Sequence, residues 1–573
     1  MKILGFNSYG HDSAAALLIN NEIAFAVEEE RLNRKKHAGG FPETAIRACL
    51  DYENLSIDDL DHVAFFWNPT ISLSKIPVYL LNFWDKVPTL LREQRSFEVE
   101  ENLGMLNYLL DMYKLPKKLK KTFQAQNTKF KFHFLEHHLC HAASAFFPSP
   151  FEESAILTID GAGEWATTLL AQGKGNNISK IQTVNTPYSL GAFYQAVSIH
   201  LGFKLIEGPG KMMGLASYGK PDGKVYEQMK QLFRLKDNGG FDFDMSYFSY
   251  HYTRKSGVSE KFTKLFGESK KEGKDWSEHE LEVAAAAQHI VEDVVMHMAK
   301  HLKKVTKSDN LCMAGGVALN SVTNGIIAKS GLFRDIFIQP AAGDSGTAIG
   351  AALLLNHQKL NRPRQIQKTA FLGPEYDNEA CLKAIQDAGL PYRIAGEEIY
   401  NFTAEKLMQN KIIAWFQGRM EFGPRALGNR SILANPMDKD MKDILNKRVK
   451  FREAFRPFAA IVTEEDCGTF FDHDYPNPYM LLVYNVREEY RSIMPSLTHV
   501  DGTVRIQTVN ENENAPMQKL LKTFESISGY PVLINTSFNI KGEPIVCTPQ
   551  DAVHSFANAD MDFLILNDII VWK

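Results

Sequence analysis

Two histidines four residues apart are the first candidates for chemistry in this sequence. His137 and His141 lie in the stretch FLEHHLCHAASAF, whose leucine and alanines favour a helix. At that spacing both imidazoles project from one helix face, whereas His138 points about 100° away. The spacing is typical of metal ligands, although packed or surface histidines also show it.

Two carboxylates could complete a metal site with these histidines. Asp160 follows the apolar run SAILTI and precedes glycine, where a strand meets a turn, and Asp344 precedes a Gly/Ala-rich helical pattern. Taken singly, Asp160 could be a turn former and Asp344 a helix N-cap. A set of nitrogen and oxygen ligands without thiolate instead predicts a divalent transition metal such as Fe(II), not a closed structural zinc.

A cationic segment in the C-terminal part is the second chemical feature. Between residues 419 and 456 there are ten Lys or Arg against five Asp or Glu, in a chain of net charge −4. A solvated helix face explains Lys439 and Lys442. It does not explain the arginines of GRMEFGPRALGNRSI and VKFREAFRPFAAIV, which alternate with Phe, Pro, Gly and Leu. Guanidinium groups in a partly apolar setting suit bidentate phosphate binding, so this domain is predicted to bind phosphates.

Glycine-rich stretches in the N-terminal part suggest a nucleotide nearby. Residues 206–221 carry four glycines around Lys211, and such a loop could approach an anion, although an irregular surface loop fits equally well. Gly315 and Gly316 lie between a predicted strand and a predicted helix, where backbone N–H groups can meet phosphate or ribose.

His11 and Asp12 form a further polar pair. They lie in the first connection of a predicted β-meander over residues 2–30. Such a pair can face a ligand's phosphates or a reacting hydroxyl, or only close the turn.

The elements that position these residues predict an α/β fold. The order of strand, polar connection, strand, turn and strand recurs in AILTIDGAGEW, ATTLLAQGK and ISKIQTV, which indicates an internal duplication. Helices are predicted at 42–52 and 278–305, and a mainly helical insertion at 77–123. The polar segment 357–369 is predicted as a linker between a domain at 1–356 and another at 370–573.

Bulk composition excludes several classes of protein. A length of 573 residues predicts two to four domains, and the near balance of 64 basic and 68 acidic residues argues against a general nucleic-acid-coating role. Six scattered cysteines without a CxxC motif indicate a reducing cytosol. We expect no signal peptide, and the most apolar region, 76–91, is too interrupted to span a membrane. The prediction is therefore a cytoplasmic protein with neither nucleic acid nor membrane as partner.

The motifs taken together resemble one family from end to end. In order they are GHDSAA, EHHLCHAASAF, LTIDGAGEW, GKMMGLASYG, AGGVALN, PAAGDSGTAIGAA, EFGPRALGNRSI, REAFRPFA and NTSFN. This string resembles the NodU/CmcH family of O-carbamoyltransferases, of which the tobramycin carbamoyltransferase is the best-understood type. The resemblance implies an N-terminal ASKHA-type domain with duplicated β-meander and helix halves, followed by a C-terminal YrdC-like α/β domain.

The same resemblance implies a reaction and a set of site residues. Carbamoyl phosphate and ATP would give carbamoyl-adenylate in the second domain, and the carbamoyl group would then move to a hydroxyl of a small-molecule acceptor in the first. Carried over by motif, the resemblance implies the metal ligands His137, His141, Asp160 and Asp344 and the carbamoyl phosphate and ATP ligands Arg425, Lys450, Arg456, Arg505 and Ser537. To the second set we add Arg419 and Asn535 from the residue pattern, and the predicted adenylate ligands of the N-terminal domain are Lys211, Gly315, Gly316 and Asn320. His11 is the predicted general base, neutral near pH 7, with Asp12 as its orienting partner or as a partner on the phosphate side. Fe(II) in the first domain and Mg with ATP are the expected ions.

Three other functions fit parts of the pattern. A tRNA threonylcarbamoyl transferase would use threonine and bicarbonate, and its binding would fall steeply with salt. An ASKHA sugar kinase would release ADP and leaves the arginines unexplained. A nucleotide-sensing scaffold would bind ATP without turnover. The sequence leaves open the acceptor alcohol and its pathway, the physiological metal, a homodimer, and the route of the intermediate between domains.

Overall fold

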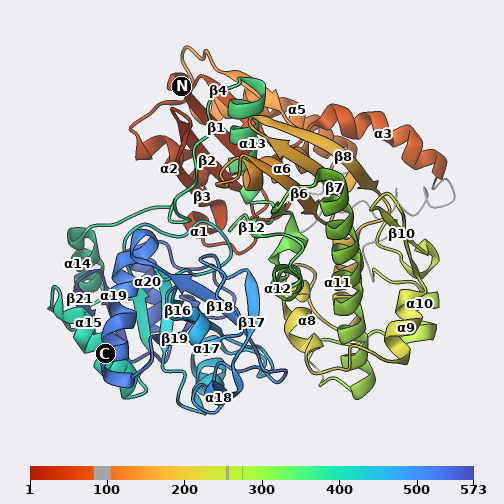
Figure 1. Cartoon of the computed structure of the whole chain (residues 1–573). Coiled ribbons are helices and arrows are strands. Elements are labelled where there is room, and N and C mark those ends of the chain that lie inside the picture. The colour runs from red at the N-terminus through yellow and green to blue at the C-terminus, as the bar shows by residue number, and fades with distance from the viewer. Residues whose placement is uncertain (83–104, 253–256, 274) are drawn as a thin grey trace. The chain divides into compact units, whose positions relative to one another are not determined.

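The chain folds into two compact units that each combine helices with mixed β-sheets. The computed structural model describes residues 1–82, 105–252, 257–273 and 275–573 (Figure 1). Unit 1 comprises Met1–Glu29 and His37–Gln367, and unit 2 comprises Glu30–Lys36 and Lys368–Lys573. The α/β class predicted from the sequence is confirmed.

The first sheet of unit 1 is built around its first strand. Its order is β3-β2-β1-β4-β5. The strands β1 (Lys2–Asn7), β2 (Ala14–Ile19) and β3 (Glu22–Glu28) form the predicted antiparallel meander. Strands β4 (His62–Phe65) and β5 (Lys131–Phe134) then add in parallel beside β1.

The second sheet of unit 1 repeats this order. It runs β12-β11-β6-β7-β8, with β6 (Glu153–Ile159), β7 (Ala166–Lys174) and β8 (Asn177–Asn185) as the antiparallel meander. Strands β11 (Asn310–Ala314) and β12 (Asp335–Ile338) add in parallel beside β6. The predicted duplication is confirmed, and the doubled strand order agrees with the two halves expected of an ASKHA-type domain.

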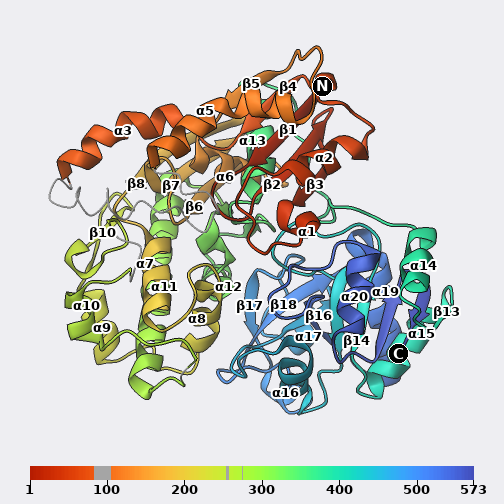
Figure 2. The same cartoon turned by 180° about the vertical axis from the view of Figure 1, so that it is seen from behind.

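Two helices pack against each other between these sheets (Figures 1 and 2). Helix α6 (His137–Phe146) packs on β6 and β11, and α13 (Gly346–Leu353) packs on β1 and β2. A Cβ atom on Gly350 would lie 1.9 Å from the Cys140 carbonyl oxygen, so the close approach of the two helices requires glycine there. The histidine helix is therefore fixed in the middle of unit 1.

Other helices cover the outer faces of the two sheets. Helix α2 (Glu43–Tyr52) packs on β2 and β3, and α11 (Glu278–Thr306) packs on β6 and β7. Both helices are predicted from the sequence. Helix α11 begins with a capping box between Ser277 and Glu280. The predicted insertion is helical in α3 (Pro69–Asn82) and α5 (Met105–Thr122), while its part at 83–104 lies outside the described residues.

The glycine-rich stretch 206–221 is mostly a helix, so its prediction as a loop is wrong. Helix α8 spans Gly208–Ala216, with Pro209 in its first turn. Proline is preset for that position, and the Lys, Met, Leu and Ala residues that follow have high helix propensity. The glycines therefore do not form an open loop around Lys211.

Unit 2 contains a single nine-stranded mixed sheet among its described residues. Its order is β13-β21-β20-β14-β15-β19-β16-β18-β17. The strands are β13 (Tyr392–Ile394), β14 (Ile413–Phe416), β15 (Arg430–Ala434), β16 (Ala459–Thr463), β17 (Leu482–Asn485), β18 (Thr503–Val509), β19 (Val532–Ser537), β20 (Phe563–Leu566) and β21 (Ile569–Val571). Helices α15 (Glu398–Met408) and α19 (Glu511–Ser528) pack together, and their buried side chains form one core with Trp415 and Leu533 of the sheet.

The boundary between the units falls after Gln367, within the segment 357–369 that is predicted as a linker. Unit 1 extends to Gln367, and Arg364 is anchored within it. The Arg364 guanidinium donates hydrogen bonds to the carbonyl oxygens of five residues, namely Phe146, Phe147, Ser149, Phe151 and Gly175. It also lies 4.3 Å from the ring centre of Phe146. A polar composition suggested a linker, but the guanidinium satisfies the carbonyls at the end of α6.

Replacing Arg364 with Met should therefore destabilise unit 1. Methionine keeps a flexible apolar stem against Phe146 but leaves the carbonyl oxygens without their donor, at a cost of roughly 1–3 kcal/mol for each buried group left unpaired. We expect the thermal unfolding midpoint of unit 1 to fall by several degrees, measured by differential scanning calorimetry. Arg362→Met, at an exposed position two residues earlier, is the control. Equal midpoints in the two variants would refute the anchoring role.

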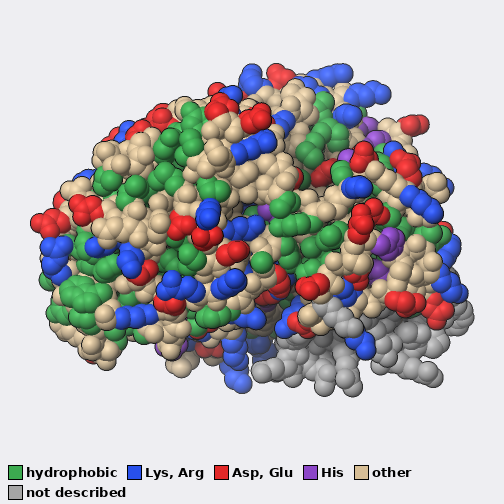
Figure 3. All heavy atoms as spheres, turned by 90° about the horizontal axis from the view of Figure 1, so that it is seen from below, with side chains coloured by type: hydrophobic (Ala, Val, Ile, Leu, Met, Phe, Trp, Pro, Cys, Tyr) green, Lys and Arg blue, Asp and Glu red, His purple; other side chains and the backbone are tan. Residues whose placement is uncertain are grey.

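Two further features of the described residues are the apolar character of the helices and the distribution of surface charge. Within the described ranges, no helix combines the length and the apolar character needed to cross a membrane. On the face drawn in Figure 3, Lys and Arg side chains are interspersed with Asp and Glu side chains.

Candidate functional site

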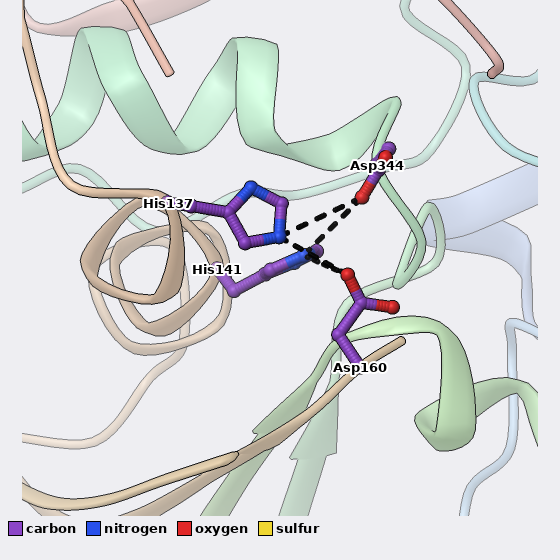
Figure 4. Close-up of side chains that lie close together, drawn as sticks. All are labelled: His137, His141, Asp160 and Asp344. Carbon is purple, nitrogen blue, oxygen red and sulfur yellow. Dashed lines mark hydrogen bonds and ion pairs between the residues drawn. The ribbon is translucent and has the colours of Figure 1, made fainter. Parts of the chain in front are cut away.

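The four predicted metal ligands lie together in unit 1. Figure 4 shows both imidazoles directed from α6 towards Asp160 and Asp344. The Nε2 atom of His137 lies 3.0 Å from Oδ2 of Asp160 and 3.8 Å from Oδ1 of Asp344. The Nε2 atom of His141 lies 3.4 Å and 3.6 Å from the same two oxygens. One ligand atom from each of the four side chains lies within 4.8 Å of all the others.

Local structure explains why these side chains converge. His137 and His141 occupy the first turn and the following turn of α6, while Asp160 follows β6 and Asp344 precedes α13. His138 points elsewhere, as its helix position predicts, and its Nδ1 lies 2.7 Å from the Thr158 hydroxyl oxygen. The alternative of Asp344 as a helix N-cap is wrong, because the N-cap of α13 is Ser345.

Glu164 fixes the start of the histidine helix, and sequence reasoning did not identify it. Its carboxylate accepts hydrogen bonds from the backbone N–H of His137 at 3.0 Å and from that of Asn68 at 2.8 Å. A carboxylate at a helix N-terminus is stabilised by the helix dipole. Burial nevertheless raises the pKa of Glu164 to about 7. The sequence signal that could have identified Glu164 is its position in the motif DGAGEW, four residues after Asp160.

The donor set fits a divalent cation. The two histidines are 1% and 0% exposed and the two aspartates 14%, and the buried Nε2 of His141 has no hydrogen-bond partner. Burial opposes a charged imidazole, but the facing carboxylates of Asp160 and Asp344 outweigh it and raise the pKa of His141 to about 9. Contacts with His137 and His141 outweigh the effect of burial on Asp160 and hold its pKa well below the usual range. Two concentrated negative charges beside two imidazoles are the electrostatics of a cation site.

The double glycine contacts the metal ligands directly. The Gly316 N–H donates a 3.0 Å hydrogen bond to Oδ1 of Asp160, which leaves Oδ2 facing the histidines. Gly315 has φ +92°, and a Cβ atom on it would lie 2.2 Å from the Ile159 carbonyl oxygen. Close packing against the end of β6 therefore accounts for these glycines. Their contact with adenylate stays a prediction.

The other two predicted adenylate ligands have partners within unit 1. Lys211 in α8 forms a 3.4 Å ion pair with Glu207. Asn320 is buried, caps helix α12 (Ser321–Lys329), and exchanges hydrogen bonds with Gln288. The side chain of Asn320 thus already has a structural role, and the sequence could not reveal its partner on α11.

His11 and Asp12 contact each other in the connection between β1 and β2. The Nδ1 atom of His11 lies 2.9 Å from Oδ2 of Asp12, and the His11 side chain is 40% exposed. Burial opposes the charged imidazole, but the hydrogen bond to Asp12 and the carboxylate of Asp344 outweigh it and raise the pKa of His11 to about 10. Nearby carboxylates therefore stabilise the imidazolium, which opposes the neutral state predicted near pH 7.

Unit 2 gathers a cluster of cations that repel one another. We call it the cation cluster: Arg425, Lys450, Arg452, Arg456 and Arg505. Burial and the charge of Arg456 lower the pKa of Arg425 to about 10. Burial and the charges of Arg425, Arg452 and Arg456 hold the pKa of Arg505 well below its usual range. Glu453 lies 3.9 Å from Arg456 and offsets part of this charge, and a bound anion would neutralise more of it.

Strand register brings the elements of this cluster together. Ala459 on β16 pairs with Arg505 on β18 and with Asn535 on β19, so these three positions form one row across the sheet. The buried Nε atoms of Arg425 and Arg505 have no hydrogen-bond partner. These atoms are therefore available to a ligand.

Lys450 lies at the end of a π-helical turn, Leu445–Lys450, beside the end of β19. Its Nζ atom lies 3.3 Å from the Ser537 hydroxyl and 2.9 Å from Oδ1 of Asn539. Burial, together with the charges of Arg452, Arg456 and Lys36, lowers the pKa of Lys450 well below its usual range. Lysines in such surroundings are typical of functional sites.

Two residues of the predicted phosphate-binding set, Arg419 and Asn535, have partners within unit 2, and one further arginine joins the cation cluster. Arg419 donates hydrogen bonds to the carbonyl oxygens of Gly373 at 3.2 Å and Leu372 at 2.6 Å, so its phosphate role stays a prediction. Asn535 is buried and donates to Oε1 of Gln507 at 2.8 Å. Arg452 was missed, although it belongs to the same motif as Arg456. Burial and Arg456 lower its pKa to about 9, which places it in the cation cluster.

Comparison with known proteins identifies the family. Residues 2–353 match the family model described as carbamoyltransferase N-terminus, and residues 404–573 match the one described as carbamoyltransferase C-terminus. The chain belongs to the carbamoyltransferase family and is an enzyme of the class predicted from its motifs.

Three relatives are similar in sequence to this chain over different shares of its length. The chain is 40% identical to the uncharacterized protein sll1178 of Synechocystis sp., covering 100% of this chain and 96% of that protein. It is 35% identical to the nodulation protein NolNO of Sinorhizobium fredii, covering 99% and 80%. It is 34% identical to the 3'-hydroxymethylcephem-O-carbamoyltransferase of Amycolatopsis lactamdurans over a shorter region, 44% of this chain and 46% of that protein.

Proposed function

We propose that this enzyme makes carbamoyl-adenylate in unit 2 and transfers its carbamoyl group to an alcohol in unit 1. The observation that carries the proposal is the pair of sites: a cation cluster in one unit and a His₂Asp₂ cation site in the other. The first site suits phosphates, and the second suits a reacting carbonyl or hydroxyl next to a metal.

The first reaction uses the charge of the cation cluster. Water cleaves carbamoyl phosphate to carbamate and phosphate, and a carbamate oxygen then attacks the α-phosphorus of ATP while pyrophosphate leaves. Arg425 and Arg505 neutralise the charge that develops on the phosphates, and Lys450 and Ser537 supply further donors. Carbamate is a poor electrophile, whereas its mixed anhydride with AMP has a good leaving group.

The second reaction takes place at the His₂Asp₂ site. His137, His141, Asp160 and Asp344 would hold a divalent ion, and that ion would supply Lewis-acid stabilisation of several kcal/mol. The acceptor oxygen attacks the carbamoyl carbon, AMP leaves, and the hydroxyl proton passes to His11. A cation held by Asp160 and Asp344 would offset the effect of these two carboxylates on His11. The pKa of His11 would then fall from about 10 towards its ordinary value, and His11 could accept that proton.

Finer assignments follow from the ligand chemistry. We propose Fe(II) as the ion, because two imidazoles and carboxylates with open positions suit it, and Mg as the partner of ATP. The acceptor is a small hydroxylated molecule of the natural-product or sugar class, in line with the name of the cephem-acting relative. The six cysteines are all free and buried, which supports a cytoplasmic location. We also propose a homodimer, which gel filtration would test.

Incubation of the protein with ATP, carbamoyl phosphate and Fe(II) tests this function. We expect mass spectrometry to detect carbamoyl-adenylate and pyrophosphate before any acceptor is added. Adding 3'-hydroxymethylcephem and a panel of sugars should then yield AMP and one carbamoylated alcohol.

Each alternative function gives a different product when its own substrates are added to this assay. ADP formed with a sugar would identify a kinase. Threonylcarbamoyl-adenylate formed from threonine and bicarbonate would identify a tRNA-modifying enzyme. ATP binding without any product would identify a scaffold, and any of these three results would reject the proposal.

A further inference from the structure

Asp12 is held at both of its carboxylate oxygens. Oδ2 contacts Nδ1 of His11 at 2.9 Å, and Oδ1 contacts Nδ1 of His37 at 2.8 Å. Because an ionised carboxylate only accepts hydrogen bonds, both imidazoles donate Nδ1–H to it. Nε2 of His11 is then the nitrogen left to take a proton, and His37 has no part in the reaction described so far.

The segment that carries His37 is tied to the segment that carries His11. The Gly39 and Ala38 carbonyl oxygens each accept a 2.7 Å hydrogen bond, from the backbone N–H of Tyr9 and of Ser13 respectively. A Cβ atom on Gly39 would lie 1.9 Å from the Gly10 carbonyl oxygen, so no larger residue fits there. His37 is thus delivered to Asp12 by a fixed backbone.

Asp12 has an unusual backbone conformation for a residue with a side chain. Its φ is +56°, in the left-handed region that aspartate adopts more readily than most residues but still at some energetic cost. Two imidazole contacts on one carboxylate help to stabilise that conformation. Strain of this kind is typical of functional sites.

The same loop lies against the metal ligands of unit 1. A Cβ atom on Gly10 would lie 3.3 Å from Oδ2 of Asp344. A small movement of this loop therefore changes the distance between His11 and any group bound at the His₂Asp₂ site, and reaction rates are sensitive to displacements of that size.

We propose that His37 is a positioning residue for carbamoyl transfer: it holds Asp12, and Asp12 holds His11. The proposal rests on the function proposed above. A carboxylate held at one oxygen can rotate about its side-chain bond, whereas one held at both oxygens keeps its plane. Without His37, Asp12 rotates, and the His11 ring loses its single tautomer and orientation.

The test compares His37→Ala with His37→Asn in the full-length protein loaded with Zn(II). Asparagine can still donate a side-chain N–H to Oδ1 of Asp12, whereas alanine cannot. With ¹⁵N-labelled histidine, His11→Asn identifies the His11 signals. We expect His37→Ala to change the His11 nitrogen shifts to those of mixed tautomers and His37→Asn to restore them. The matched control is His297→Ala, at a surface histidine of α11 whose Nε2 contacts the Lys236 carbonyl oxygen.

Activity supplies the second readout. His37→Ala should slow decay of carbamoyl-adenylate in unit 1 about 10- to 100-fold and leave pyrophosphate release unchanged. Wild-type nitrogen shifts for His11 in His37→Ala would overturn the proposal, whatever the acceptor is. A failure of the proposed function would look different, because the wild-type protein itself would then release no pyrophosphate.

Discussion

Arg505→Gln should abolish pyrophosphate release and at the same time raise the thermal unfolding midpoint of the free protein. Glutamine keeps most of the side-chain volume but removes one of the charges that repel Arg425, Arg452 and Arg456. Loss of that repulsion stabilises the free protein, whereas loss of a guanidinium at developing phosphate charge costs roughly 10²- to 10⁴-fold in kcat/KM. Pyrophosphate release and differential scanning fluorimetry measure the two effects.

Ligand binding separates this explanation from general damage to the fold. Inorganic pyrophosphate should raise the midpoint of the wild-type protein, because a ligand that binds only the folded state stabilises it, and should do so much less in Arg505→Gln. Lys439→Gln, which removes an exposed cation outside the cation cluster, is the control and should change neither property. A lower midpoint for Arg505→Gln, or unchanged pyrophosphate release, would contradict the assignment of the cation cluster to phosphates.

The fold was predictable where the signal is local and periodic. The meander at 2–30, its repeat at 153–185 and the long helix α11 all follow from alternation, turn residues and capping residues near one another in sequence. The stretch 206–221 failed because four glycines suggested a loop, whereas Pro209 and the residues after it form a helix. Residues 30–36 join unit 2 through contacts of Arg31 with Gly423 and of Arg34 with Ile545, pairings that local sequence does not encode.

The candidate sites were likewise predictable only where the signal is local. The i, i+4 spacing predicted one helix face for His137 and His141, and the ends of apolar runs pointed to Asp160 and Asp344. Their convergence required the packing of α6 on α13, which depends on a close approach at Gly350. The contact between His37 and Asp12 joins positions 25 residues apart through a loop without periodicity, and the raised pKa of His11 depends on Asp344, far away in sequence. Sequence patterns identified the residue types but not these charges and partners.

Asp160→Asn should remove the metal and carbamoyl transfer together, while carbamoyl-adenylate still forms. Asparagine keeps the acceptor for the Gly316 N–H but removes the charge beside His137 and His141. The site then loses one of its two carboxylate charges, and metal content should fall from about one ion per chain to a small fraction of that. Transfer should fall by roughly 10²- to 10³-fold, because metal polarisation contributes several kcal/mol. Plasma mass spectrometry measures the metal, and pyrophosphate and carbamoylated product measure the two reactions.

Chelation of the wild-type protein should reproduce the phenotype of this variant, and adding Fe(II) back should restore transfer to the wild-type protein only. His138→Asn is the sharpest control, since His138 lies on the same turn as His137 but faces Thr158 rather than the aspartates. It should retain both metal and transfer. Full metal content in Asp160→Asn, or wild-type transfer by the chelated protein, would contradict the role of the His₂Asp₂ site. Mg is supplied with ATP after the chelator has been removed, and loss of pyrophosphate release under these conditions would instead assign the ion of unit 1 to the adenylation step. Carbamoyl-adenylate formation in unit 2 is expected to proceed without that ion.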